Sequence, residues 1–174
     1  MDIRKSALIG RASTNDSAAV VALGQSKLAA EMSESQLATL AGQVVFRELA
    51  AGEVLVPEGT SDNHLYVIVS GALAVVRGAR NAESTTLFTL GTGDFAGEMS
   101  FIDATAHYAS LVAAGPTRVL GLEREKLEAL LDSHPQIVYR VMRAIIRTVH
   151  VIQRRLAMQS VELTNYITKQ HGRY

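Results

Sequence analysis

The chain has 174 residues, of which 48% are hydrophobic, and its formal net charge is +0 at pH 7. This length suits one domain plus an appended element, and the neutral charge indicates neither a nucleic-acid-binding protein nor an acidic tail. The absence of cysteine excludes disulfides, thiolate metal sites and cysteine nucleophiles, and is compatible with a reducing compartment. Neither a signal-peptide core nor an apolar run of about 20 residues is evident, so we expect a soluble cytoplasmic protein without membrane contact.

Residues 1–32 are rich in alanine and serine and show only weak patterning, which predicts a flexible or helical lead-in. A firmer element begins at Ser33. Ser33 and Gln36 match a capping box, with a hydroxyl at the N-cap and an amide side chain three residues later. Leu37 and Leu40 follow at helical spacing, and we expect this short helix to end before Gly42.

Between residues 43 and 122 the hydrophobic pattern changes to that of short strands. The run from Leu65 to Val69 is a clean strand, and polar and apolar residues alternate from Thr85 to Leu90. Glycines separate these runs. Short strands broken by glycine turns predict a sandwich or barrel rather than a βαβ sheet, and we assign residues 33–133 to this domain.

A long helix is predicted over residues 134–166, beginning near Pro135, with residues 167–174 as a tail. Its apolar positions recur at alternating steps of four and three residues, the pattern of a coiled-coil seam with one polar position. We therefore expect a homodimer through this helix, although an amphipathic helix packed only on its own domain has the same pattern. The expected seam consists of Val138, Met142, Ile145, Val149, Ile152, Leu156, Gln159 and Leu163.

The same helix carries a basic stripe on the side away from the expected seam. The stripe is formed by Arg140, Arg143, Arg147, Arg154 and Arg155, and no aspartate or glutamate lies between residues 134 and 161. An exposed stripe of this kind suits an acidic partner or a nucleic-acid backbone. An ordinary solvated helix face is the simpler explanation.

One segment between the strands, from Gly93 to Asp103, carries the chemistry of a candidate ligand site. Gly97 permits a tight turn, and residues 98–102 then form one helical turn whose first N–H groups are unpaired. Such N–H groups suit an anion such as phosphate, and the carboxylate of Glu98 suits a ribose hydroxyl. Together they predict a nucleotide site, although a purely structural turn has the same sequence.

The order of strands and glycines around this segment resembles the cyclic nucleotide-binding domain family, in particular the sensory domains of catabolite activator-type regulators. The resemblance covers about residues 36–156. It implies a mainly β fold with flanking helices: a jelly-roll β-barrel (a cupin-like double-stranded β-helix) with an N-terminal helix and a long C-terminal dimerisation helix. It is carried by Gly52-x-x-Leu55-x-x-x-Gly59, the run from Leu65 to Val75 and the run from Gly93 to Phe101.

The resemblance also implies a regulatory role, a phosphate-binding cassette and a ligand, cyclic AMP or cyclic GMP. In such a cassette the Glu98 carboxylate holds the ribose 2′-hydroxyl, and the backbone from Gly97 to Ser100 faces the cyclic phosphate. Transcription factors of this family carry a helix-turn-helix domain after the long helix. Only residues 164–174 follow the seam here, so we expect no direct DNA binding.

The end of the cassette departs from the family pattern, which usually has Pro-Arg, a small residue, Ala and Thr. Here His107 replaces the phosphate-binding arginine and Tyr108 replaces the small residue. An imidazole has a pKa of about 6.5 and lacks the bidentate geometry of a guanidinium, which weakens phosphate binding by about 10²- to 10⁴-fold. The expected ligand-binding residues are Gly97, Glu98, Met99, Ser100, His107, Tyr108 and Ser110.

Three hypotheses stay open for this pocket. It binds a cyclic nucleotide weakly or with a protonated His107, it binds a different ligand, or it is vestigial in a dimerisation or interaction module. A metal-dependent cupin enzyme is disfavoured because only His64 and His107, of the five histidines, lie among the strands, without paired ligand spacing. Ser100 has no neighbouring base in the sequence, so we predict no catalytic residue and no enzyme.

Overall fold

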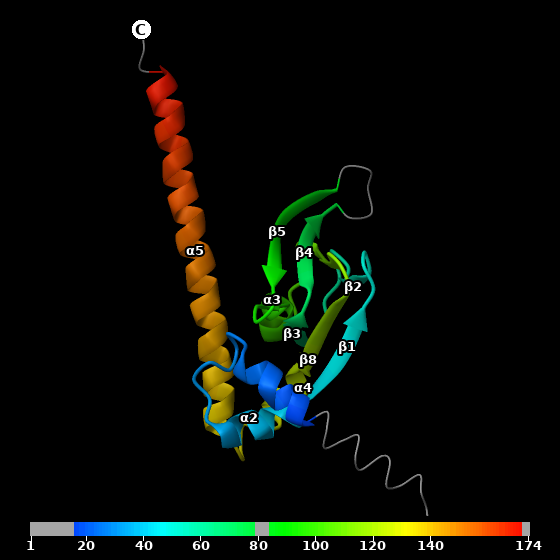
Figure 1. Cartoon of the computed structure of the whole chain (residues 1–174). Helices are drawn as coiled ribbons and strands as arrows, with labels where there is room; N and C mark the ends of the chain where they lie inside the picture. The colour runs from blue at the N-terminus through cyan, green and yellow to red at the C-terminus, as the bar shows by residue number, and fades with distance from the viewer. Residues whose placement is uncertain (1–15, 79–83, 172–174) are drawn as a thin grey trace, which may run out of the picture.

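The computed structural model describes residues 16–78 and 84–171, which form a β-barrel flanked by helices. A long helix, α5 (Pro135–His171), runs along the barrel and then continues past it (Figure 1). The other elements, in chain order, are α2 (Glu34–Ala41), β1 (Val44–Leu49), β2 (Val54–Val56), β3 (His64–Ser70), β4 (Ala72–Arg77), β5 (Thr85–Gly91), β6 (Phe95–Ala96), α3 (Glu98–Asp103), β7 (Ser110–Ala113), β8 (Thr117–Glu123) and α4 (Arg124–Glu128).

The described strands form two four-stranded sheets, with the orders β1-β8-β3-β6 and β2-β7-β4-β5. Their pairings are antiparallel, and the central ones join distant segments, as when Leu65 of β3 pairs with Leu122 of β8. The chain passes repeatedly from one sheet to the other, which is a jelly-roll-like arrangement. The predicted barrel of short strands with flanking helices and a C-terminal helix is therefore confirmed.

The turn between β3 and β4 requires a glycine. Gly71 has a φ angle of +82°, and a Cβ atom there would lie 2.5 Å from the carbonyl oxygen of Pro116 in a neighbouring turn. The N–H of Ala72 donates a hydrogen bond to Oγ1 of Thr117 at 3.3 Å. Two turns far apart in the sequence are thus packed directly against each other.

The capping box predicted at the start of α2 is confirmed. Ser33 Oγ accepts a hydrogen bond from the Gln36 N–H at 3.4 Å, and the Gln36 side chain accepts one from the Ser33 N–H at 3.1 Å. Of the predicted lead-in, residues 1–15 lie outside the described residues, and residues 16–24 are helical. This helix is docked more firmly than its weak patterning indicated, because Ala19 and Leu23 are buried in the core.

Strand β3 separates two hydrophobic cores. Leu65 and Val67 belong to the core shared with the helices, whereas Ile68 belongs to the core inside the barrel, as expected when side chains alternate along a strand. The first core also receives three fully buried α5 side chains, Ile137, Val141 and Ile145. Burial of an aliphatic side chain contributes about 1.5–3 kcal/mol, so these contacts hold the first third of α5 on the core.

The position of α5 corrects the expected dimer seam. Ile145 is 0% exposed within the core of its own chain, so its side chain is not available to a partner. Instead, α5 leaves Tyr139 (59% exposed) and Ile146 (51% exposed) on its surface. The helix has two apolar faces, and a heptad pattern does not tell which of them packs against the barrel.

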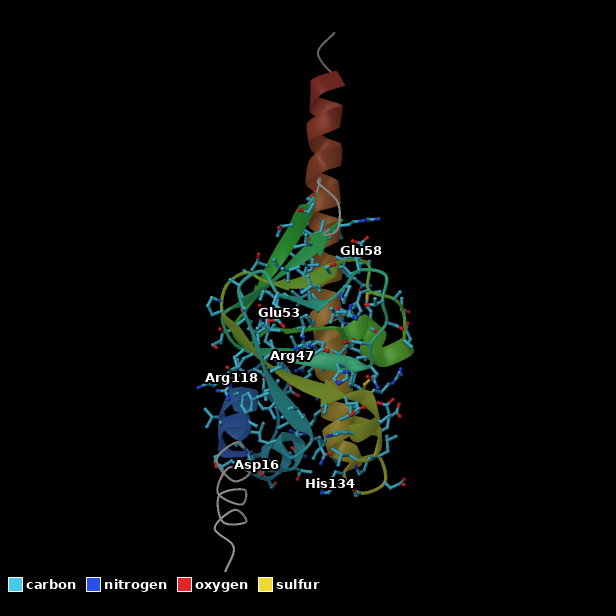
Figure 2. The ribbon with its side chains drawn as sticks, turned by 90° about the vertical axis from the view of Figure 1, so that its right-hand side faces the viewer. Asp16, Arg47, Glu53, Glu58, Arg118 and His134 are labelled. Atoms are coloured by element: carbon cyan, nitrogen blue, oxygen red, sulfur yellow. The ribbon has the colours of Figure 1, made fainter. Side chains whose placement is uncertain are left out.

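The structure describes the side chains of only some of the remaining seam positions. Val138 and Met142 are partly buried against the core of their own chain, and Ile152 is exposed. The side chains of Leu156, Gln159 and Leu163 lie outside the described ones. The helix itself continues past the predicted end at residue 166, as far as His171, and both views show it projecting beyond the barrel (Figure 1, Figure 2).

Candidate functional site

A left-handed glycine sets the geometry of the candidate site. After β6, Gly97 adopts a φ angle of +92° and turns the chain into α3. A Cβ atom on Gly97 would lie 2.6 Å from the carbonyl oxygen of His64 in β3. Only glycine adopts this angle without strain and allows such a close approach. The corner between β6 and α3 is therefore packed against β3, and Glu98 begins α3.

A pocket of about 70 Å³ lies beside α3. One water occupies about 30 Å³ in the liquid, so the pocket by itself holds only a small group. Its walls are mostly apolar, with Glu98, His107, Tyr108 and Thr148 as the residues that carry polar side-chain atoms. The lining residues are Val75, Phe88, Leu90, Phe95, Ala96, Gly97, Glu98, Met99, His107, Tyr108, Ala109, Leu111, Thr148 and Ile152.

The pocket adjoins a larger groove of about 880 Å³ between α5, β5 and the segment that precedes α2. Phe88, Leu90, Phe95, Tyr108, Thr148 and Ile152 line both the pocket and the groove. Small-molecule sites usually have volumes of about 300–1,000 Å³. A ligand that contacts Glu98 and is larger than the pocket therefore has to extend into the groove.

The half-buried Glu98 is the carboxylate of the pocket. Among the described residues, no hydrogen bond or ion pair involves its side chain, and Gly97 before it contributes no side-chain cap. Burial, followed by the negative charge of Glu98, raises the pKa of the neighbouring Tyr108 hydroxyl. Glu98 thus presents a carboxylate with free acceptor positions beside a phenol that stays protonated at neutral pH.

His107 is bound to an internal carboxylate. Its Nε2 atom lies 3.2 Å from Oδ1 of Asp62, and the Tyr66 hydroxyl donates to Oδ2 of Asp62 at 2.7 Å. The backbone holds the ring in place, because the His107 N–H donates to the Thr60 carbonyl and its own carbonyl accepts from the Gly59 N–H, each at 2.8 Å. One ring nitrogen of His107, Nε2, is therefore already within hydrogen-bond distance of Asp62 in the absence of a ligand.

Two pKa shifts follow from this cluster. Burial by itself raises the pKa of Asp62, but the hydrogen bonds from His107 and Tyr66 and the charge of His107 outweigh it, so the pKa of Asp62 lies below its usual value. Burial, together with the hydrogen bond to Asp62 and its charge, raises the pKa of Tyr66 above the usual range. The cluster therefore keeps Asp62 ionised and Tyr66 protonated.

Two of the predicted site residues do not line the pocket. The Ser100 side chain is fully buried, and its Oγ accepts a hydrogen bond from the Asp62 N–H at 2.8 Å and contacts the Asp62 carbonyl oxygen. The Oγ of Ser110, also buried, accepts from the Glu58 N–H at 2.9 Å. Both hydroxyls hold neighbouring loops in place, whereas Gly97, Glu98, Met99, His107 and Tyr108 come together around the pocket.

Several residues of the site come together only through the fold, and nothing in the sequence pointed to them. Thr148 and Ile152 of α5 and Phe88 of β5 line the pocket, and Asp62 pairs with His107. Asp62 lies in an ordinary turn sequence, so no local signal distinguishes it. Thr148 is a polar residue between the apolar positions of α5. Its polarity identifies it as a candidate site residue only once the helix is placed against the barrel.

No group of three or more histidine, aspartate or glutamate side chains in residues 16–78 and 84–171 is arranged to hold a metal ion. Within the same residues, no helix combines the length and the apolar character needed to cross a membrane.

Comparisons with known proteins agree with this architecture. A cyclic nucleotide-binding domain solved from Methylobacillus flagellatus KT superimposes with a TM-score of 0.71 at 24% identity, covering 88% of this chain and 85% of the other. The CRP-like cAMP-activated global transcriptional regulator of Mycobacterium tuberculosis is 25% identical over 123 residues, which cover 71% of this chain and 55% of that protein. Lysophospholipase NTE1 of Phaeosphaeria nodorum is 26% identical over 123 residues, which cover 70% of this chain and 8% of that protein.

The chain spans about half the length of the bacterial regulator and a small part of the lysophospholipase. The shared region is therefore one domain that occurs both in a regulator and in an enzyme. The model of the family described as "Cyclic nucleotide-binding domain" matches residues 46–134, about half of this chain. The chain therefore belongs to the cyclic nucleotide-binding domain family.

Proposed function

We propose that this chain is a regulatory, non-enzymatic sensor that binds a cyclic nucleotide, cyclic AMP or cyclic GMP, in the pocket beside α3. The observation that carries the proposal is the Glu98 carboxylate, which lines the pocket without a described protein partner. Membership in the family supports it, as does the M. tuberculosis relative, which is named as cAMP-activated. We also propose a cytoplasmic location, with which the cysteine-free composition is compatible.

The proposed ligand occupies both the pocket and the groove. The ribose hydroxyls donate to Glu98, and the cyclic phosphate faces the backbone that follows Gly97. The base extends toward Thr148 and the apolar side chains of Phe88 and Ile152, which line both spaces. Because Thr148 and Ile152 belong to α5, ligand binding favours one position of this helix over another if the two positions differ in affinity.

The phosphate end is the weak part of the site. The imidazole of His107 has two ring nitrogens, and Nε2 is 3.2 Å from Asp62. An arginine has five N–H donors and serves a carboxylate and a phosphate together. Charged hydrogen bonds contribute about 1.5–3 kcal/mol each, so we expect cyclic nucleotides to bind more weakly here than in a pocket with the arginine.

Calorimetric titration with cyclic AMP and cyclic GMP at pH 7.5 and pH 6 tests the proposal, with Glu98→Gln as the variant that removes the ribose acceptor. Micromolar binding that Glu98→Gln weakens by about tenfold supports it. Binding only at pH 6 assigns the phosphate contact to protonated His107. No heat with millimolar ligand at either pH contradicts the proposal.

The second candidate function is a dimerisation or interaction module whose pocket is vestigial or holds another ligand. Tyr108, which is 50% exposed and lines both pocket and groove, favours it, because a bulky ring occupies a place where the family usually has a small residue. This candidate predicts no response to cyclic nucleotides in the titration above and the same oligomeric state with and without them.

Either function includes a homodimer, and we propose that it forms through a face of α5 rotated away from the expected seam. Tyr139, Met142, Ile146, Val149 and Gln153 follow the same three- and four-residue spacing. Tyr139 and Ile146 are exposed, whereas the buried Ile145 lies outside this set. The rotated face keeps both helices on their own barrels while they pair with each other.

A further inference from the structure

The segment between the first helical residues and α2 is fixed on the core and forms a short bridge. Leu28 and Ala29 are buried in the core that also holds Ile145 of α5. Ser26 is buried as well, and its hydroxyl donates to the Leu23 carbonyl at 2.7 Å. The charged side chains of this segment are therefore attached to a backbone that is fixed on the core. Figure 1 shows the segment, in blue, beside the lower part of α5.

One end of the bridge holds the turn that leads into the ligand site. The Lys27 N–H donates to the Gly93 carbonyl at 2.9 Å, and the Lys27 ammonium pairs with the Asp94 carboxylate. Asp94 in turn accepts from the Gly91 N–H at 2.9 Å. This turn immediately precedes β6 and Gly97, so Lys27 supports the corner from which Glu98 projects.

The other end holds α5. The carboxylate of Glu31 lies 3.3 Å from Arg143 and also pairs with Arg147, which lies one helical turn further along. No aspartate or glutamate occurs on α5 between residues 134 and 161, so the carboxylate that pairs with Arg143 and Arg147 comes from outside this part of the helix. Hydrogen bonding to Arg147 lowers the pKa of Glu31, and the charges of Arg143 and Arg147 act in the same direction.

The bridge therefore joins the two walls of the ligand site. Arg147 is adjacent to Thr148, which lines the pocket, and Ile152 follows little more than one turn later. The three fully buried α5 side chains precede this region, and among the described residues the core cluster includes no α5 side chain beyond Ile145. Glu31 holds the helix at the level where it covers the pocket.

We propose that residues 27–31 form an electrostatic bracket that positions α5 over the pocket, with Glu31 as the positioning residue. The proposal rests on the proposed function in one respect, that the pocket bracketed in this way takes a cyclic nucleotide. Exposed ion pairs are individually weak. The bracket therefore biases an equilibrium between a docked α5, which lies over the pocket, and a swung-out α5, which has moved away from it. It does not lock the helix, which allows a ligand to shift this equilibrium.

Distance measurement between spin labels tests the bracket without any ligand. The chain contains no cysteine, so cysteines introduced at Glu48, which is exposed on β1, and at His150, which is exposed on α5, are labelled selectively. Dilution into unlabelled protein suppresses distances between copies. In this background Glu31→Gln is compared with Glu31→Asp, Arg147→Gln and the matched control Glu128→Gln, which removes an exposed acid that takes no part in these ion pairs.

We expect Glu31→Gln to raise the ratio of swung-out to docked α5 about fivefold, in line with the strength of a small exposed ion-pair network. Arg147→Gln, and 1 M NaCl acting on the parent protein, should produce the same change. Glu31→Asp should restore much of the docked population, and Glu128→Gln should leave it unaltered. An unchanged distance distribution in both Glu31→Gln and Arg147→Gln overturns the bracket.

A calorimetric arm separates the bracket from the proposed function. If the parent binds cyclic AMP, Glu31→Gln should weaken the affinity in proportion to the docked population that it removes, by about fivefold at most, and Glu31→Asp should recover most of the loss. Equal affinity in parent and Glu31→Gln overturns the positioning role while leaving the proposed function intact. Absence of binding by the parent overturns the proposed function and the ligand part of the bracket together, whereas the distance measurement still decides the docking of α5.

Discussion

The Nε2 atom of His107 lies 3.2 Å from Oδ1 of Asp62. The His107 side chain thus has an internal partner before any ligand arrives. Ser100 holds the Asp62 backbone, and the Tyr66 hydroxyl binds the other carboxylate oxygen. This arrangement fixes the imidazole beside the pocket and leaves it poorly equipped to neutralise a phosphate.

We expect His107→Arg to raise the affinity for cyclic AMP by about ten- to a hundredfold at pH 7.5, because a guanidinium contacts Asp62 and a phosphate at the same time. It should also remove any gain in affinity between pH 7.5 and pH 6. Titration calorimetry measures both effects. Tyr108→Ala serves as the comparison, since it opens space without adding charge. Unchanged affinity in His107→Arg would mean that the phosphate does not lie near residue 107.

The acid stability of the domain should depend on Asp62. Its pKa is lowered in the folded chain, so ionised Asp62 stabilises the fold above its unfolded pKa of about 3.9, and this contribution is lost as the pH falls through the lower folded value. We expect the free energy of unfolding to decrease less between pH 7 and pH 3 in Asp62→Asn than in the parent. Urea unfolding at the two pH values measures it, with the exposed Asp132→Asn as control.

Gly97→Ala should destabilise the domain by about 2 kcal/mol or more, since the φ angle of +92° and the carbonyl of His64 at 2.6 Å both oppose a Cβ atom. Gly91→Ala is the matched control, because no atom lies within 4 Å of a Cβ at that position. Thermal unfolding of the two variants compares them directly. Equal melting temperatures would contradict the tight corner between β6 and α3.

Ile146→Arg should dissociate the proposed dimer, because it places a charge in the middle of the rotated α5 face. Val151→Arg, on an exposed position outside that face, should leave the dimer intact. Light scattering coupled to size-exclusion chromatography gives the mass of each species. A monomeric parent protein would refute the dimer, and a dimer disrupted only by Val151→Arg would place the interface elsewhere on α5.

The local features of this fold are readable from the sequence because each has a short-range cause. The capping box of Ser33 and Gln36 depends on two residues that are three positions apart. The left-handed backbone at position 97 is a property of that residue alone, and glycine is the residue type that favours it. The strands follow from alternation and from the glycines between them. The position of Glu98 at the start of α3 was likewise predictable, since it follows directly from the turn before it.

Only the tertiary structure decided which residues far apart in the sequence come into contact. His107 and Asp62 are 45 residues apart, and Glu31 and Arg147 are 116 residues apart. Periodicity identified an apolar face on α5 but not its partner, which is why Ile145 proved to be a core residue. The reason is physical: hydrophobic patterning fixes which side of an element avoids water, whereas packing against other elements determines what that side meets.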